Sequence, residues 1–187
     1  IPEKDIAIAT TAGVANMQQV LSLIWDILLP DVTGDTLPED PVAHKELLEQ
    51  LDTLSIPLAA GDLTRRHAPA SWRFQPNAAG ITDVSIFFGD KDCTLIFHSK
   101  NGEEKLHAGL GFNCDNLLQL NDPYLRRTAA SAAWISDSVL EIALCCYEGS
   151  FREVFRIDFA SAEKPLTSTF RFCCFRTPFL PELTVEL

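Results

Sequence analysis

The chain has 187 residues, of which 47% are apolar and 22% charged, and its formal net charge is −11. This size and balance fit one globular domain, or one domain with a small appendage, around an apolar core. The acidic charge argues against a nucleic-acid surface, which needs clustered lysine and arginine. No apolar run approaches the roughly 18 residues of a membrane-spanning helix, and no export signal is visible, so we expect a cytoplasmic protein without membrane partners.

The N-terminal region predicts one strand and one helix. Residues 6–11 form a short apolar run compatible with a β-strand, and an unpaired strand of this kind needs a partner. We therefore expect it to pair with a second copy of the chain, giving a homodimer, or with the β-domain that follows. Asn16 then predicts a helix N-cap, and Pro30 the end of that helix. The apolar stripe of this helix consists of Met17, Val20, Leu21, Ile24 and Leu28.

A second amphipathic helix is predicted after Asp40-Pro41, a capping residue followed by proline at the first helical position. Its apolar stripe consists of Leu47, Leu48, Leu51 and Leu54, and the helix ends before Pro57.

From Trp72 onwards, the period of the apolar pattern changes from 3.6 to 2, which indicates β-strands. The expected strands are 71–76, 82–88, 92–99, 104–110, 128–135, 138–147, 151–159 and 165–175. The only long connection is 111–127. The sequence therefore predicts a mainly β, α+β protein: an eight-stranded antiparallel up-and-down, lipocalin-like barrel or a curled sheet, preceded by a strand and two helices.

Two hairpins suggest a register. If Asn101-Gly102 are the central residues of the first turn, Lys100 faces Glu103, and the core pairs are Phe97/Leu106, Leu95/Ala108 and Cys93/Leu110. If Gly149-Ser150 form the second turn, the core pairs are Ile142/Ile157, Leu144/Phe155 and Leu140/Phe159. A slip of one residue would mix apolar and polar sets, so the alternation supports both hairpins.

Metal and cofactor chemistry finds little support in the sequence. The six cysteines include the adjacent pairs Cys145-Cys146 and Cys173-Cys174, each of which sends one thiol inward and one outward on a strand, as expected of reduced structural cysteines. No CxxC, CxH or HxxxH spacing for zinc is present. His98 and His107 are expected as diagonal neighbours on a polar face without a carboxylate beside them, so we interpret them as surface residues. We expect no cofactor and no metal.

Several strings, in this order and spacing, carry a family resemblance: Trp25-Asp-Ile-Leu-Leu-Pro30, Leu37-Pro-Glu-Asp-Pro41, Trp72-Arg-Phe-Gln-Pro-Asn77, Ala133-Trp134, Leu140-Glu-Ile-Ala-Leu144 and Tyr147-Glu148 with Phe151. Over its whole length the chain resembles the C-terminal region of bacterial serine hydrolases related to class C β-lactamases and penicillin-binding proteins. The resemblance implies a division into 1–30, a strand-plus-helix remnant of an upstream hydrolase domain, 31–69, a linker with one amphipathic helix, and 70–187, a β-barrel-like domain.

The catalytic SxxK motif of that family is expected upstream, so the resemblance assigns no catalytic residue to this chain. Ser161-Ala-Glu-Lys164 has the right letters, but it lies between two strands and precedes Pro165. The chemistry needs the serine at a helix N-terminus with the lysine one turn later. A turn is therefore the better interpretation of this string.

The resulting hypothesis is a non-catalytic accessory domain that completes the fold of a serine hydrolase and shapes substrate access. Its partner would be the upstream catalytic domain of the same parent chain. A candidate docking face is formed by Glu141, Tyr147, Arg152 and Arg156, which converge on the polar side of one hairpin. The alternative is a free-standing lipocalin-like barrel that binds a small apolar ligand in an open interior.

Overall fold

The chain folds as two units, residues 1–55 and 56–187. The computed structural model describes residues 1–10, 14, 16–34, 38–120, 124–149, 151–172 and 183–186.

The first unit is helical. A 3-10 turn, η1 (Pro2–Lys4), precedes α1 (Met17–Leu23), the π-helical turn η2 (Ile24–Leu28) and α2 (Leu29–Asp31), and α3 (Pro41–Thr53) follows. Both predicted N-caps are confirmed. Asn16 Oδ1 accepts a hydrogen bond from the amide of Gln18 at 3.0 Å, and Asp40 Oδ1 accepts from the amides of Val42 and Ala43.

Two expectations for this unit were wrong. Pro30 does not end the first helix, because the π-turn lets Leu29 donate to the carbonyl of Ile24, five residues back, and the helical backbone continues to Asp31. Residues 6–10 form no strand, and Thr11 lies outside the described residues. Instead, Ile6 and Ile1 close a turn: the N-terminal ammonium of Ile1 donates to the carbonyl of Ile6 at 2.7 Å, and the Ile6 amide donates to the carbonyl of Ile1.

Over its described residues, the second unit forms a sheet of nine strands. They are β1 (Ala70–Arg73), β2 (Ile81–Phe88), β3 (Asp92–Ser99), β4 (Gly102–Leu110), β5 (Cys114–Leu118), β6 (Arg126–Trp134), β7 (Val139–Cys146), β8 (Phe151–Asp158) and β9 (Leu166–Phe172). All eight predicted strands are present. The missed one, β5, lies in the stretch that was expected to be a long connection.

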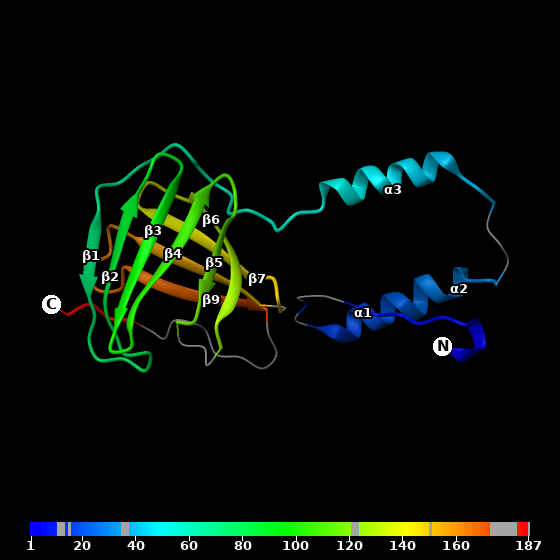
Figure 1. Ribbon diagram of the computed structural model, residues 1–187, viewed down its shortest axis with the longest axis horizontal. Helices are drawn as coiled ribbons and strands as arrows, with labels where there is room; N and C mark the ends of the chain where they lie inside the picture. The colour runs from blue at the N-terminus through cyan, green and yellow to red at the C-terminus, as the bar shows by residue number, and fades with distance from the viewer. Residues whose placement is uncertain are drawn as a thin grey trace. The chain divides into compact units, whose positions relative to one another are not determined.

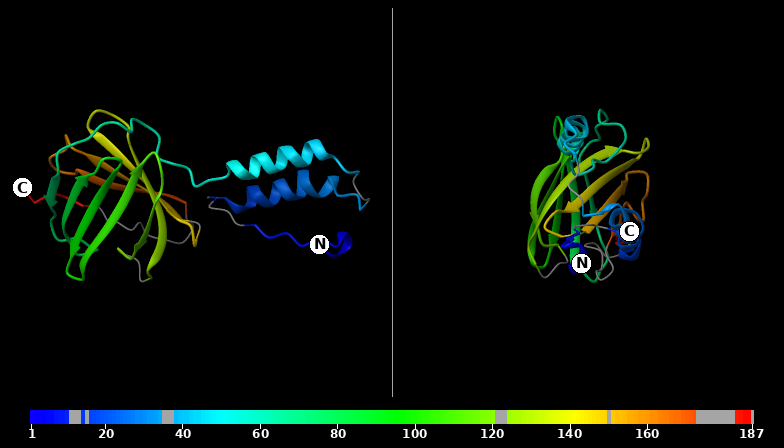
Figure 2. Two further views of the ribbon diagram at one scale, coloured as in Figure 1. Left: turned by 45° about the horizontal axis from the view of Figure 1, so that its top comes forward. Right: turned by 90° about the vertical axis from the view of Figure 1, so that its right-hand side faces the viewer.

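The sheet curls into a half-barrel, with β2 to β5 on one side and β6 to β9 on the other (Figures 1 and 2). Its order is β1-β2-β3-β4-β6-β7-β8-β9, with β5 paired to β6. The pairs are antiparallel except β4 and β6, which run parallel where Gly109 and Leu110 meet Ser131 and Ala132. The sheet is therefore mixed, and the purely antiparallel up-and-down order was wrong. Residues 183–186 lie beside the end of β1, where Phe74 pairs with Val185.

Both predicted hairpin registers were wrong by a two-residue shift. In the first hairpin Leu95 faces Leu106 and His98 faces Glu103, because the turn is Lys100-Asn101 and Gly102 already belongs to β4. In the second, Ile142 faces Phe155, and the last pair of the ladder is Cys146 with Phe151. A shift of two residues keeps every side chain on its own face, and the predicted core and polar faces are therefore confirmed.

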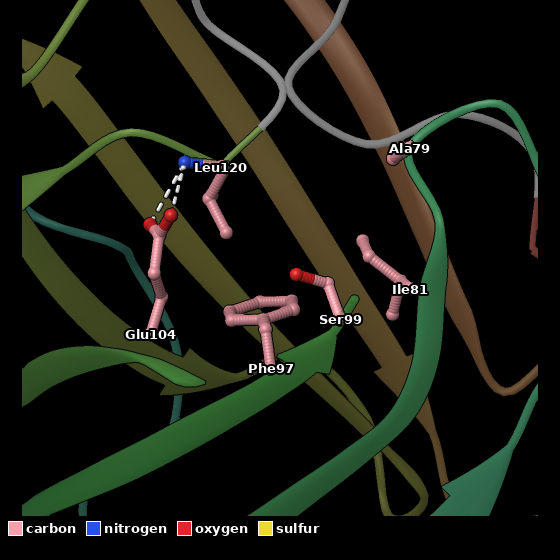
Figure 3. A pocket seen from close by; sticks show the side chains of 6 residues that line it. All are labelled: Ala79, Ile81, Phe97, Ser99, Glu104 and Leu120. Atoms are coloured by element: carbon pink, nitrogen blue, oxygen red, sulfur yellow. Dashed lines mark hydrogen bonds between the residues drawn. The ribbon is translucent and has the colours of Figure 1, made fainter. Parts of the chain in front are cut away.

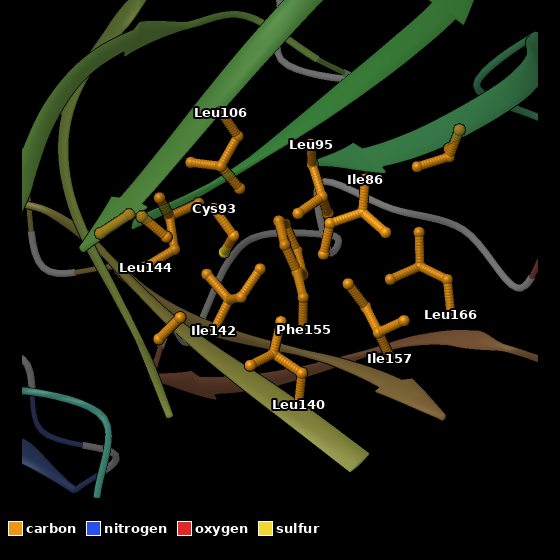
Figure 4. Close-up of a cluster of buried hydrophobic side chains, with 14 of the residues drawn as sticks. Ile86, Cys93, Leu95, Leu106, Leu140, Ile142, Leu144, Phe155, Ile157 and Leu166 are labelled. Atoms are coloured by element: carbon orange, nitrogen blue, oxygen red, sulfur yellow. The ribbon is translucent and has the colours of Figure 1, made fainter. Parts of the chain in front are cut away.

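The inward face of the half-barrel is filled by apolar side chains that point towards one another between the two sides of the sheet (Figure 4). Phe97 from β3 and Phe155 from β8 are among its largest fully buried residues, and their rings meet edge to face with centroids 6.4 Å apart. Around them lie Ile86, Leu95, Leu106, Leu140, Ile142, Leu144 and Ile157. Interdigitated branched and aromatic side chains of this kind stabilise the unit by excluding water.

Strand β5 joins β4 through a side chain. Asn116 Oδ1 accepts from the amide of His107 at 2.7 Å, and its Nδ2 donates to the carbonyl of His107 at 2.9 Å and to that of Cys114 at 3.0 Å. Asn116 is buried. Its amide thus replaces a backbone pair in the gap between the two strands, and it satisfies polar groups that would otherwise lose their partners.

We predict that Asn116→Ala lowers the free energy of unfolding by about 2 kcal/mol, because it leaves the His107 amide and carbonyl without their partner. Urea denaturation followed by circular dichroism measures the change. Asn101→Ala, in the exposed turn of the β3–β4 hairpin, is the matched control and should change stability by less than about 0.5 kcal/mol. Equal losses in the two variants would contradict the role given to Asn116.

Candidate functional site

The predicted docking face lies on the outer side of the β7–β8 hairpin. Glu141 and Arg156 are directly opposite each other, and Glu141 Oε2 accepts from Nε and Nη2 of Arg156 at 3.0 and 2.9 Å. Arg152 faces Cys145 further along the ladder, and Tyr147 lies just beyond β7 with 43% of its surface exposed. The structure therefore joins Glu141 to Arg156 in an ion pair and places Arg152 and Tyr147 nearer the turn.

The two histidines of the β3–β4 hairpin are not neighbours. His98 faces Glu103 and His107 faces Thr94, four ladder positions away, or about 13 Å along the strands. The expectation of a diagonal pair was wrong, as was that of no carboxylate nearby, since His98 Nδ1 lies 3.8 Å from Glu103 Oε2. His107 Nδ1 lies 2.9 Å from Thr94 Oγ1. Among the described residues, no group of three or more histidine, cysteine, aspartate or glutamate side chains is arranged to hold a metal ion.

Ser161 and Lys164 lie in the connection between β8 and β9. The Ser161 hydroxyl oxygen accepts a hydrogen bond from the backbone amide of Lys164 at 3.2 Å. This is a side-chain turn in which the serine oxygen meets a backbone amide rather than a basic side chain. The geometry that activates a serine nucleophile, a general base beside a hydroxyl at a helix N-terminus, is not built at Ser161.

The thiols are placed as structural residues. Cys93, Cys114, Cys145 and Cys146 are free, with Cys93 and Cys146 buried and Cys145 half-buried, so the inward-outward alternation predicted for Cys145-Cys146 is confirmed. Burial raises the pKa of Cys93 and that of Cys146 to about 12. Cys173 and Cys174 lie outside the described residues. A thiol with so high a pKa is a poor nucleophile and metal ligand, because both roles need the thiolate.

An aromatic cluster closes the end of the half-barrel at which β2, β6 and β8 finish. It consists of His67, Trp72, Phe88, Trp134 and Phe159. The His67 and Phe159 rings are 4.1 Å apart between centroids, and Trp134 Nε1 donates to the carbonyl of Arg65 at 3.0 Å. The backbone of Asp62 pairs with that of Trp134, which ties the segment before β1 over this end. The cluster covers this end of the apolar core.

The opposite end contains a carboxylate that the sequence reasoning did not identify. Glu104 faces Phe97 across the β3–β4 ladder and borders a cavity of about 20 Å³ (Figure 3). Its oxygens accept from the backbone amides of Gln119 and Leu120 at 2.8 to 3.0 Å. Leu120 has φ +43°, so the carboxylate holds the end of β5 in a strained turn. Alternation along the strand already placed Glu104 on the same face as Leu106. A carboxylate on a core face is unusual, and this could have identified Glu104 from the sequence.

Glu104 also borders an open surface hollow of about 580 Å³, whereas the cavity of Figure 3 is small. It is lined by Ala79, Ile81, Phe97, Ser99, Glu104 and Leu120, and its volume is close to that of a single water site. With both carboxylate oxygens engaged by backbone amides, Glu104 serves the fold of this end.

The first unit presents a different surface, which we call the helical apolar surface. It consists of exposed apolar residues of α1 and η2, namely Met17, Leu21, Leu23, Trp25, Ile27 and Leu28, and of α3 and its C-cap, namely Val42, Leu47, Leu48, Leu51 and Leu54. Trp25 has 53% of its surface exposed, and of the described residues in this unit only Leu29 is buried. The predicted stripes exist, and their side chains are exposed.

Comparisons with protein-family models, with curated proteins and with solved structures gave no match. Among the described residues, no helix is long and apolar enough to cross a membrane.

We predict that the buried thiols resist alkylation. Relative to an ordinary thiol pKa of 9.0, a pKa of about 12 lowers the thiolate fraction at pH 8 about a thousandfold. Iodoacetamide should therefore modify Cys93 and Cys146 only after unfolding in urea, as followed by peptide mass spectrometry. In the unfolded chain these thiols lose their protons at a lower pH than in the folded protein. The free energy of unfolding should therefore fall as the pH rises from 9 towards 12. Rapid labelling of either one in the native protein would contradict this.

We predict that the ion pair on the β7–β8 hairpin is worth more than a surface pair. The Glu141 side chain is 16% exposed, so Arg156→Ala should cost about 1 kcal/mol in urea denaturation by leaving that carboxylate without its cation. The matched control is Arg73→Ala, whose partner pair Arg73–Asp83 is more exposed, and its cost should stay below about 0.5 kcal/mol. The charge swap Glu141→Arg with Arg156→Glu should recover part of the loss, and a swap no better than Arg156→Ala would count against the pairing.

Proposed function

We propose that the chain is a non-catalytic accessory module of a bacterial serine hydrolase related to class C β-lactamases. The carrying observation is the contrast between the two units. The half-barrel buries its apolar side chains inside, whereas the helical unit leaves its apolar side chains uncovered. Such a molecule works through its surfaces, as an accessory module does.

The chemistry of the described nucleophiles supports a non-catalytic role. The Ser161 hydroxyl accepts a backbone amide in a turn, and burial raises the pKa of both Cys93 and Cys146. The free thiols also support a cytoplasmic location, in which cysteines stay reduced.

The choice of parent rests on the resemblance described above. In this proposal the upstream catalytic domain of the parent chain supplies the acyl-serine chemistry and cleaves an amide or ester. The module completes the parent's fold and shapes the access of substrate. The outer face of the β7–β8 hairpin, with the Glu141–Arg156 pair and the exposed Tyr147, is the proposed docking face for that domain.

A lipocalin-like binding role finds less support. It needs an interior open to an apolar ligand, whereas Phe97, Phe155 and their neighbours occupy the inward face. The cavity that Phe97 and Ile81 line has a volume of about 20 Å³.

The proposal is tested with an acylating probe and with the gene. We expect a fluorescent penicillin and a fluorophosphonate to leave the purified chain unlabelled. Labelling that Ser161→Ala abolishes would overturn the non-catalytic role. The complete reading frame should encode an SxxK motif and a YxN-like motif upstream of Ile1. Their absence would overturn the serine hydrolase parent and leave the accessory role to be judged on the labelling alone.

A further inference from the structure

The helical apolar surface is too large to be an incidental feature of the first unit. Its residues come from every turn of the 17–31 helix and from α3, where all but Val42 share one stripe, and each has more than a third of its surface exposed. Of the fifteen residues from Met17 to Asp31, ten are apolar, and the polar ones are Gln18, Gln19, Ser22, Asp26 and Asp31, so apolar side chains take up most of the circumference of this helix. A helix with so wide an apolar arc is normally buried against more than one neighbour.

The charge of this unit selects its partner. Residues 1–55 contain ten acidic and two basic residues, a formal net charge of −8, whereas residues 56–187 contain sixteen acidic and thirteen basic residues, a net charge of −3. The helical unit therefore carries most of the charge of the chain in less than a third of its length. An apolar surface inside so negative a field attracts cations and repels anionic surfaces.

The acidic residues lie where they can guide a partner. On α3, Glu46 and Asp52 stand one residue before Leu47 and one after Leu51, so they border the leucine stripe on its two sides. The only basic residue of α3, Lys45, is 3.6 Å from Glu49 and leaves Glu46 and Asp52 to face outward. An apolar stripe with acidic borders matches an apolar stripe with basic borders.

Other occupants fit this surface less well. A second copy would bring a net charge of −8 against −8, and a bilayer with anionic lipids would be repelled in the same way. A cationic amphipathic helix satisfies both the apolar residues and the charge.

We propose that the helices over residues 17–31 and 41–54 provide a docking site for a cationic amphipathic segment of a partner protein, which lays its apolar face on the helical apolar surface and its lysine or arginine side chains along the acidic borders. This inference does not depend on the serine hydrolase parent, since it specifies the chemistry of whatever segment covers the helices.

The test uses the full chain and three fluorescein-labelled 18-residue peptides, followed by fluorescence anisotropy. The probe is a Leu/Lys peptide with amphipathic helical spacing. One control has the same composition in a scrambled order without an apolar face, and the other has every lysine replaced by glutamate. We expect saturable binding of the probe, at least tenfold weaker binding of both controls, and weakening of probe binding between 0.05 and 0.5 M salt.

Matched variants locate the site. Leu47→Gln with Leu51→Gln should weaken probe binding at least tenfold, and Glu46→Gln with Asp52→Asn should weaken it threefold or more and reduce its salt dependence. Leu117→Gln, at a residue 58% exposed on β5, and Asp90→Asn with Glu163→Gln, at exposed acids of the second unit, should leave it unchanged. Circular dichroism checks that α3 remains helical, and helix loss would move the test to Leu54→Gln at the C-cap.

Three results would overturn the proposal. Absence of probe binding removes it directly. Equal binding of the scrambled peptide shows charge attraction alone, and equal binding of the glutamate peptide shows that charge is irrelevant. Sedimentation that finds a dimer, dissociated by Leu47→Gln with Leu51→Gln, assigns the surface to a second copy instead. Penicillin labelling tests the proposed function separately, so either idea can fail without the other.

Discussion

Filling the concave face of one curled sheet is the constraint on which the β unit depends. Phe97 and Phe155 meet near its centre, and the inward residues of the neighbouring strands complete the packing around them. Because water must be kept from this face, its polar groups need partners within the protein: Glu104 and Asn116 accept from backbone amides, and the buried Glu153 accepts from the hydroxyl of Ser168. The space inside is used for stability. What the protein recognises must then be recognised on its surfaces.

This constraint explains how much of the fold the sequence predicted. Alternation gave all eight strands that follow it and assigned Leu95, Leu106 and Ile142 to the buried face. It does not distinguish registers that differ by two residues, because both bury the same side chains, and the choice of turn residues was wrong in both hairpins. Strand β5 was not predicted because one of its buried residues, Asn116, is polar and interrupts the apolar alternation. The hydrogen bonds that make its burial possible come from β4 and are visible only in the folded structure.

The candidate site was less predictable than the fold. Face assignment placed Glu141 and Arg156 on one face of the hairpin, which survived the register error, but their direct pairing and the separation of His98 from His107 depend on the register and were not predicted. The helix caps at Asn16 and Asp40 are local and were predicted correctly. The exposure of the leucine stripe on α3 is not a local property. A stripe of four leucines looks the same in sequence whether its cover lies in the same chain or in another.

Because β4 pairs with β6, the order of the other strands does not depend on β5. Gly109 and Leu110 contact Ser131 and Ala132 directly, so the sheet is continuous without β5, which lies beside the main path of strands. β5 and the described residues beside it, 111–120, thus form an excursion from the main path of strands, in which β5 pairs with β6 alone. Homologous chains can vary the exposed parts of this excursion without reordering the strands, provided that the buried Asn116 and Leu118 keep their contacts, and variation between relatives should gather in those exposed parts first.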